Sequence, residues 1–411
     1  MNCKMINKIF KDTAYIRTGG TKEELACAEY IKSLCAERGL NAKIEAFPIT
    51  MYETKTARLV VDGREIPCKA FNGSESKTVA AGFYYLNNLS SASLRKCKDK
   101  IVLLGGRLTF SIYDKLTENN ALGIITYNGN ICYRDTDIEQ KEICFEHKAE
   151  NRPPIININV KDAMALVKAN SKFAEITTQQ SHYIGESHNV ILDIEGESEE
   201  TIIFSAHYDS SSLSIGAYDN MSSCIALLGL AEYFSANRPK RSIRFLWCGS
   251  EERGLLGSEE YCAMHKAELE HTLLNVNLDM VGSFMGVFTA FSCINEQMAD
   301  FMTKFFKKQR VAAEVKYKIR SSDSNSFIRA GVPAISFARN TMDGTHTIHT
   351  RYDTAEMVSA KTLLTDIKLI AKFTEIFANA DEIPLSLEIT DEIKTDIQNY
   401  FKRKTRAVKE F

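Results

Sequence analysis

The spacing of apolar residues changes along the chain, and each change marks a different kind of element. Between Thr21 and Gly39 apolar side chains recur at helical spacing, which predicts an amphipathic helix that ends at the glycine. From about Tyr52 to Ser187 short β-branched runs replace this pattern, separated by loops rich in Asn, Ser and Lys. The clearest elements predicted there are strands at 58–61, 100–104 and 123–127 and a helix at 113–121.

After Ser187 the pattern becomes strand, loop and helix in repetition, which is typical of a mostly parallel sheet covered by helices. The charged tail after Leu387 has apolar residues at helical spacing, so we expect a helix that is either solvated or packed on the domain or on a second copy of the chain. The predicted strands lie at 201–206, 242–248, 273–278 and 332–337, and the predicted helices lie at 221–234, 255–266, 296–307 and 359–378.

With 411 residues, the chain exceeds the size at which one hydrophobic core usually stops growing, so we expect more than one domain. The fold class predicted is α/β, a mostly parallel mixed sheet flanked by helices, with an inserted β-rich α+β domain. The boundaries predicted are 1–50 for an N-terminal helical part of the main domain, 51–186 for the insertion, 187–385 for the main domain and 386–411 for a charged C-terminal helix.

The composition narrows the classes of partner. The net charge is −2, from 51 basic and 53 acidic residues that are interspersed, which gives no electrostatic reason to expect nucleic acid. The first residues lack the apolar run of a secretory signal and no stretch predicts a membrane span, so we expect a cytoplasmic protein with no membrane partner. The 11 cysteines form no CxxC pair, and buried free thiols are expected.

Histidine and acidic residues follow three predicted strands in succession. In open α/β sheets, ligands bind beyond the carboxyl ends of the strands, so this placement has a functional meaning that solubility and packing do not require. Each of these residue types is a good ligand for a divalent metal of borderline softness. The residues are His207 after the first strand, Glu251 and Glu252 after the second and Asp279 after the third, with Asp219 before a helix and His349 on a late loop.

Two imidazoles and three carboxylates suffice for two metal ions if one carboxylate bridges them. Ions ~3.5–4 Å apart can hold the attacking water and the substrate oxygen together and lower the pKa of the water toward ~7. A further carboxylate must take the proton of that water, and the adjacent Glu251 and Glu252 allow one to face the metal and the other the water. Asp209 is placed to accept the other ring N–H of His207 and to fix its tautomer. Zinc suits these ligands, and cobalt or manganese would fit as substitutes.

Five segments carry a resemblance: SAHYDS at 205–210, GAYDN at 216–220, GSEERGLLGS at 249–258, NLDM at 277–280 and HTRYD at 349–353. In order and spacing they resemble the M28 family of metallopeptidases, the zinc aminopeptidases and their carboxypeptidase relatives. The resemblance implies a zinc exopeptidase fold over 1–50 and 185–385 and a protease-associated domain between them. It also implies a cis peptide between Asp219 and Asn220. The implied roles are Asp219 bridging two zinc ions, His207 and Asp279 completing one site, Glu252 and His349 completing the other, and Glu251 acting as general base and then as acid.

Other positions are less specific. Ser223 stands where the family usually has glycine, Tyr218 where it commonly has an acid, and His346 competes with His349 as the late ligand, although only His349 combines a following threonine with the aspartate expected of the motif, Asp353. A further segment is similar to one near the family's substrate pocket, although it is equally well explained as a helix start capped by Ser322 or Asp323. The substrate contacts predicted are Asp323, Phe327 and Tyr352.

Four functions are compatible with this reading. The first is an aminopeptidase that acts on short peptides, alone or as a homo-oligomer, with the inserted domain either limiting substrate length or merely buttressing the fold. A carboxypeptidase or deacylase with the same metals would use Arg320, Arg329 or Arg339 for the substrate carboxylate. A cyclase that acts on N-terminal glutamine would use one zinc, and a non-catalytic scaffold would not require the intact ligand set.

Overall fold

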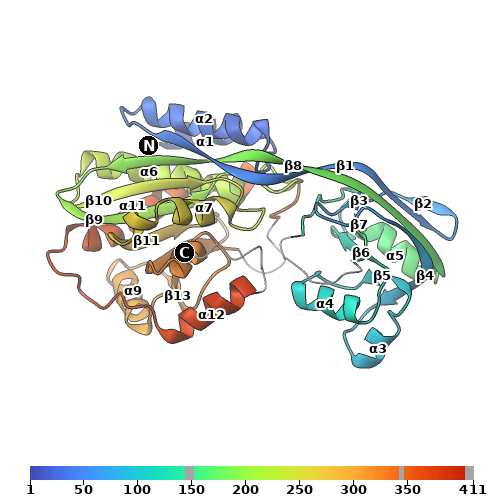
Figure 1. Cartoon of the computed structure of the whole chain (residues 1–411). Coiled ribbons are helices and arrows are strands. Elements are labelled where there is room, and N and C mark those ends of the chain that lie inside the picture. Colours follow the sequence, from blue (N-terminus) through green and yellow to red (C-terminus); the bar gives the residue numbers. More distant parts are fainter. Residues whose placement is uncertain (144–151, 342–346, 403–411) are drawn as a thin grey trace. The chain divides into compact units, whose positions relative to one another are not determined.

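The computed structural model describes residues 1–143, 152–341 and 347–402, which divide into two compact units. Unit 1 comprises Met1–Ile49 and Gly185–Tyr400, and unit 2 comprises Thr50–Ile184. Two long strands, β1 (Lys43–Val61) and β8 (Phe173–Ile194), each run from one unit into the other (Figure 1). Within the described stretches, no helix is both long enough and apolar enough to cross a membrane.

The sheet of unit 1 is mixed. Its strands lie in the order β13-β12-β14-β11-β9-β10-β8. The pairs β9–β10, β9–β11, β11–β14 and β12–β13 are parallel, whereas β8–β10 and β12–β14 are antiparallel. The predicted mixed α/β sheet is confirmed, but antiparallel pairs flank its central parallel strands on both sides, which the expectation of a mostly parallel sheet did not include. Burial patterns predict strands but not the path by which the chain returns, and that path sets strand direction. The bounds are Ser198–His207 (β9), Arg241–Cys248 (β10), Thr272–Leu278 (β11), Val287–Ser292 (β12), Ala313–Tyr317 (β13) and Ala334–Asn340 (β14).

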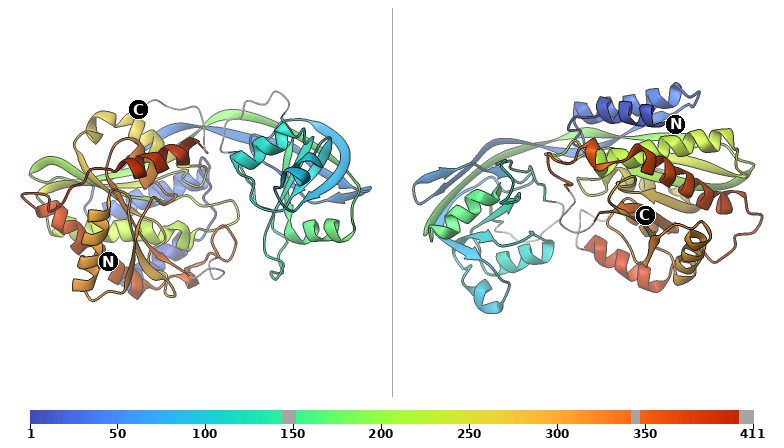
Figure 2. Two further views of the ribbon diagram at one scale, coloured as in Figure 1. Left: turned by 90° about the horizontal axis from the view of Figure 1, so that it is seen from below. Right: turned by 180° about the vertical axis from the view of Figure 1, so that it is seen from behind.

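Helices cover both faces of this sheet (Figure 2). In β9, Ile202 and Phe204 join the main core with α6 and α11, while Ile203 joins the smaller core with α7 and α10. The central strands are therefore apolar on both faces, as buried parallel strands require. The helices are α1 (Cys3–Asp12), α2 (Lys22–Ala36), α6 (Ser222–Ala236), α7 (Leu256–Met264), α8 (Lys266–Leu269), α9 (Glu296–Lys308), α10 (Ser324–Arg329), α11 (Ala360–Asn379) and α12 (Asp391–Lys402), with short turns η1 (Ala217–Met221) and η2 (Ala355–Met357).

The structure confirms the predicted helices of unit 1 and adds α1, the short α8 and the turn η2. Helix α1 has no counterpart in the prediction, although Ile6, Ile9 and Phe10 follow helical spacing and are buried. The C-terminal helix α12 is not merely solvated, because Ile393 and Ile397 are buried within the described chain. The described cysteines are free, as expected.

Unit 2 has its own sheet, with strands in the order β8-β4-β5-β6-β7-β3. Parallel pairs join β4, β5, β6 and β7, and antiparallel pairs join β4 to β8 and β7 to β3. Two separate apolar clusters fill its faces. The elements are β2 (Arg64–Ile66), β3 (Lys69–Ala70), β4 (Thr78–Leu86), β5 (Lys100–Leu104), β6 (Gly123–Asn128), β7 (Ile155–Asn159), α3 (Ser91–Arg95), α4 (Phe110–Glu118) and α5 (Val160–Lys168).

A buried ion pair fastens α11 to the end of β14. Asp366 is fully buried and accepts hydrogen bonds from Arg339 Nε at 3.0 Å, Arg339 Nη2 at 2.6 Å and the Gly282 N–H at 3.0 Å. Asp366→Ala should lower the free energy of unfolding by roughly 3 kcal/mol, because the largely buried arginine is left without its partner. Urea unfolding measures this. The matched control is Asp381→Ala, whose exposed pair with Lys240 should contribute nothing measurable, and equal losses in both variants would contradict the prediction.

Candidate metal centre

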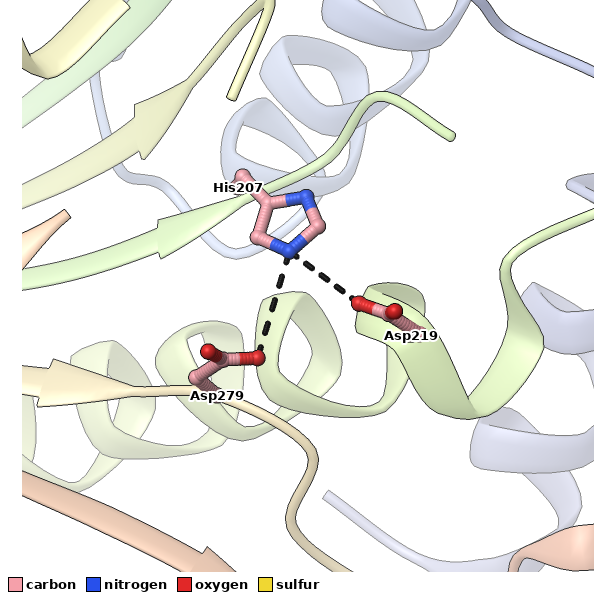
Figure 3. Close-up of side chains that lie close together, drawn as sticks. All are labelled: His207, Asp219 and Asp279. Atoms are coloured by element: carbon pink, nitrogen blue, oxygen red, sulfur yellow. Dashed lines mark ion pairs between the residues drawn. The ribbon is translucent and has the colours of Figure 1, made fainter. Parts of the chain in front are cut away.

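The first metal-ligand candidates lie at the ends of neighbouring strands. His207 ends β9 and Asp279 follows β11, and these strands are parallel partners in which Ser205 lies opposite Asn277. Their side chains therefore emerge at the same edge of the sheet, where Nε2 of His207 lies 4.0 Å from Oδ1 of Asp279. Oδ1 of Asp219 lies 3.2 Å from the same nitrogen (Figure 3). All three residues are buried, and together they form a group that could hold a metal ion.

A second group meets the first at Asp219. Nε2 of His349 lies 3.3 Å from Oδ2 of Asp219 and 3.1 Å from Oε2 of Glu252, and these three residues form the other group that could hold a metal among the described residues. Oε1 of Glu252 is buried and has no hydrogen-bond partner in the described chain. The His349 side chain is 44% exposed, so the centre opens to solvent on this side. His346, the competing ligand, lies outside the described residues.

Asp353 holds the segment that carries Asp219. Its carboxylate is fully buried and accepts the backbone N–H groups of Tyr218 at 2.8 Å and Asp219 at 3.2 Å, and the hydroxyl of Ser214 at 3.2 Å. Burial and the charge of Asp219 raise the pKa of Asp353 to about 6. The motif after His349 signalled this residue, and the structure shows that it holds the backbone next to Asp219.

Asn220 connects Asp219 to the segment around Asp279. The peptide bond between Asp219 and Asn220 is cis, as the resemblance implies. The side chain of Asn220 donates to the Leu278 carbonyl at 3.1 Å and accepts from the Met280 N–H at 2.8 Å. These bonds flank Asp279 on both sides, so the two acidic residues are held in one fixed arrangement.

Asp209 anchors the loop that carries the paired glutamates. Its two oxygens accept the backbone N–H groups of Glu251 at 3.0 Å and Glu252 at 3.2 Å. Its Oδ1 also lies 3.3 Å from Nδ1 of His207, the predicted neighbour, although that nitrogen makes no hydrogen bond within the described residues. Oε2 of Glu251 lies 3.9 Å from Nε2 of His207, so Glu251 faces the first group without belonging to it.

The electrostatics of the centre favour positive charge. Burial lowers the pKa of His207, but the carboxylates of Glu251, Asp209 and Asp219 outweigh this and raise it well above its ordinary value. Burial raises the pKa of Asp219, but the two histidines outweigh this and lower it far below its ordinary range. Burial also raises the pKa of Glu251, with Asp323 and Glu252 among the further causes, while His207 lowers it. The imidazole and carboxylate set therefore fits divalent cations, which would offset the excess of buried negative charge.

The predicted substrate contacts occupy different surroundings. Asp323 is buried, and burial raises its pKa to about 6. It occupies the N-cap position of α10, as the helix-start alternative expects, but its side chain makes no cap bond. Phe327 is fully buried and packs against Tyr261, with ring centroids 5.9 Å apart. Tyr352 is partly exposed, on the turn after His349. Their contact with substrate stays a prediction.

Arg17 is the residue of the centre that sequence reasoning missed. It is fully buried, and its guanidinium donates to the carbonyl of Tyr208 at 2.7 Å, directly after His207. It also donates to the carbonyls of Ile215 and of Gly216, just before η1. One side chain from the N-terminal segment thus joins the two loops that carry His207 and Asp219. A lone arginine between two helices gives no sequence signal for this role.

Comparison with known proteins shows which family and which solved structures this chain resembles. Residues 189–374 match Peptidase family M28. Aminopeptidase YwaD of Bacillus subtilis is 28% identical over 280 residues, which are 65% of this chain and 58% of that protein, and carboxypeptidase Q of Xenopus laevis is 30% identical over 44% of this chain and 41% of its own length. The chain thus spans under two thirds of the length of these curated relatives. The solved structure of BSAP, a zinc aminopeptidase from Bacillus subtilis, is similar with a TM-score of 0.77 at 23% identity over 95% of this chain and 98% of that one, which shows the shared fold.

Replacing Arg17 tests whether it supports the centre. Arg17→Met should weaken zinc binding about 10–100-fold, because the loops that carry His207 and Asp219 lose their common anchor. Competition with a zinc chelator measures the affinity. Arg241→Met is the matched control, because Arg241 is also buried and donates to the carbonyls of Phe377 and Ala380, away from the candidate ligands. Equal weakening in both variants would show only general destabilisation.

Proposed function

Because residues 189–374 of this chain belong to peptidase family M28, we propose that the protein is a zinc-dependent exopeptidase that releases N-terminal residues from short peptides. One observation carries the proposal. The two oxygens of Asp219 face different imidazoles, Oδ1 toward His207 and Oδ2 toward His349, at 3.2 and 3.3 Å. A carboxylate in this position suits a bridge between two cations.

The proposed site holds two zinc ions, for which cobalt or manganese can substitute. His207, Asp219 and Asp279 would hold one ion, and Asp219, Glu252 and His349 would hold the other. The buried Oε1 of Glu252, which has no partner among the described residues, supports its assignment as a ligand. The mixture of imidazole and carboxylate donors with an open side is typical of catalytic zinc sites.

Glu251 is the proposed proton carrier. The ions, when bound, would polarise the scissile carbonyl and acidify the attacking water. Glu251 accepts the proton of that water and then donates it to the leaving amine. Asp209 keeps Glu251 in place through its backbone N–H and lies beside the other ring nitrogen of His207. The same Asp209 therefore orients a ligand and the base.

The choice between the two ends of a peptide rests on charge. The acidic residues around the centre suit the ammonium group of a free N-terminus. A substrate carboxylate would need a cation, but Arg329 pairs with Glu259 and Arg339 pairs with Asp366. Arg320 supports the second candidate, a carboxypeptidase, because its Nε lies beside the centre, 3.5 Å from Oδ2 of Asp279.

A panel of dipeptides tests the proposed activity. Cleavage should require a free N-terminal amine, stop with a chelator and return with zinc, because the substrate carbonyl has to meet the metal centre. Free, N-acetylated and C-terminally blocked dipeptides are assayed for released amino acid. A requirement for a free carboxylate would favour the carboxypeptidase, and no metal-dependent cleavage of any peptide would overturn the proposed function.

Replacing the proposed base separates proton transfer from metal binding. Glu251→Gln should lower kcat about 10²–10⁴-fold, because the amide cannot accept the proton, while zinc content stays the same. Steady-state kinetics and metal analysis of the same sample measure both quantities. Glu252→Gln is the matched variant and should lose zinc. If Glu251→Gln lost the metal and Glu252→Gln kept it, the roles of the two glutamates would be exchanged.

A further inference from the structure

The loop that carries Glu251 has an unusual backbone. Ser250, the residue before Glu251, is fully buried and has a φ of 53°, in the left-handed region that favours glycine. Asp209 holds this loop only through the N–H groups of Glu251 and Glu252. A buried serine in this conformation persists only where its surroundings hold it, so a second set of contacts must act on the other side.

A chain of hydrogen bonds supplies those contacts. The hydroxyl of Ser250 donates to Oγ of Ser187 at 2.8 Å, and the hydroxyl of Ser187 donates to Oε1 of Glu24. The other oxygen of Glu24 accepts the N–H of Gly20 at 2.9 Å. All three side chains are fully buried. Direct hydrogen bonds therefore connect the first turn of α2 to the residue that precedes Glu251.

Close packing makes this arrangement tight. A Cβ atom on Gly249 would collide with Oε1 of Glu24, and one on Gly19 would collide with the side chain of Ser250. Nη1 of Arg253, on the other side of the two glutamates, donates to the Gly19 carbonyl at 3.3 Å and so also joins the loop to the N-terminal segment. The N-terminal segment and the loop can approach only because both glycines lack side chains.

Glu24 is a costly residue for a purely structural role. A buried carboxyl group needs compensation, yet no lysine or arginine of the described chain lies within 4.0 Å of it, and its one basic neighbour is His188, whose Nδ1 lies 3.7 Å away. Burial raises the pKa of Glu24, although His188 and Ser187 lower it in part. An apolar side chain at this buried position of α2 would avoid that cost.

We propose that Glu24 is a positioning residue that acts through Ser187 and Ser250 to hold the backbone of Glu251 at the metal centre. This inference rests on the proposed function, since it assigns Glu24 to the step that Glu251 performs. No hydrogen bond or ion pair of the described residues joins Glu24 to a candidate ligand, so its effect would reach the reaction through the loop.

The test is a double-mutant cycle in the full chain loaded with zinc. Ser187→Ala should lower kcat about 10–100-fold, as expected of a small misplacement of a catalytic group, with KM within about 2-fold and zinc content unchanged. Glu24→Gln should also lower kcat. The two oxygens of Glu24 accept from the Ser187 hydroxyl and the Gly20 N–H, and the amide NH2 of glutamine would face one of these donors with no lone pair to accept it. In the Glu251→Gln background, Ser187→Ala should lower the residual kcat by less than about 2-fold, because the group that it positions is already inactive.

The control separates positioning from stability. Ser292→Ala removes an equally buried hydroxyl, which donates to the Asn295 carbonyl at 2.7 Å at the end of β12, and it should leave kcat unchanged. The inference would be overturned if Ser187→Ala lowered kcat equally in the wild-type chain and in the Glu251→Gln variant. It would also be overturned if Ser187→Ala and Ser292→Ala had the same kcat. If the wild-type chain cleaves no peptide in a zinc-dependent manner, the proposed function fails instead, and the two failures are thereby distinguished.

Discussion

The repulsion among carboxylates crowded at one edge of a sheet is the constraint on which the rest of the structure depends. Asp219, Glu251, Glu252 and Asp279 converge on two imidazoles in a largely buried space, where unlike charges attract and like charges repel more strongly than in water. Such a group of acids is stable only with cations among them and with backbone that cannot move away. The need for cations explains why the acids are combined with imidazoles as metal ligands. The need for a fixed backbone explains the hydrogen bonds that surround them.

The scaffold fixes the backbone of the ligand-bearing segments. Asp353 accepts the N–H groups of Tyr218 and Asp219. Asn220 bonds to the backbone of Leu278 and Met280, on either side of Asp279. Asp209 accepts the N–H groups of Glu251 and Glu252. Arg17 performs the complementary task, because it binds carbonyl oxygens. Buried polar side chains that are satisfied by backbone groups hold loops within the tolerance that a catalytic site needs, which apolar packing alone does not provide.

Hydrophobic spacing and the residues at strand ends predicted most of unit 1 and the ligand candidates. The strands that end at His207 and before Asp279 are buried and rich in apolar residues, and charged or imidazole side chains directly after them have few structural explanations. Helix α1 did leave a local signal, the helical spacing of Ile6, Ile9 and Phe10, which the prediction did not use. Other features left none, because the antiparallel direction of β8 depends on long-range chain path and the roles of Arg17 and Glu24 depend on contacts with residues far along the chain.

The most direct test of this account is the location of metal in crystals grown with zinc and measured at wavelengths on both sides of the zinc absorption edge. The account predicts two anomalous peaks ~3.5–4 Å apart, one bound by His207 and Asp279, the other by Glu252 and His349, with Asp219 bound to both. A single peak, or a pair that does not share Asp219, would contradict it.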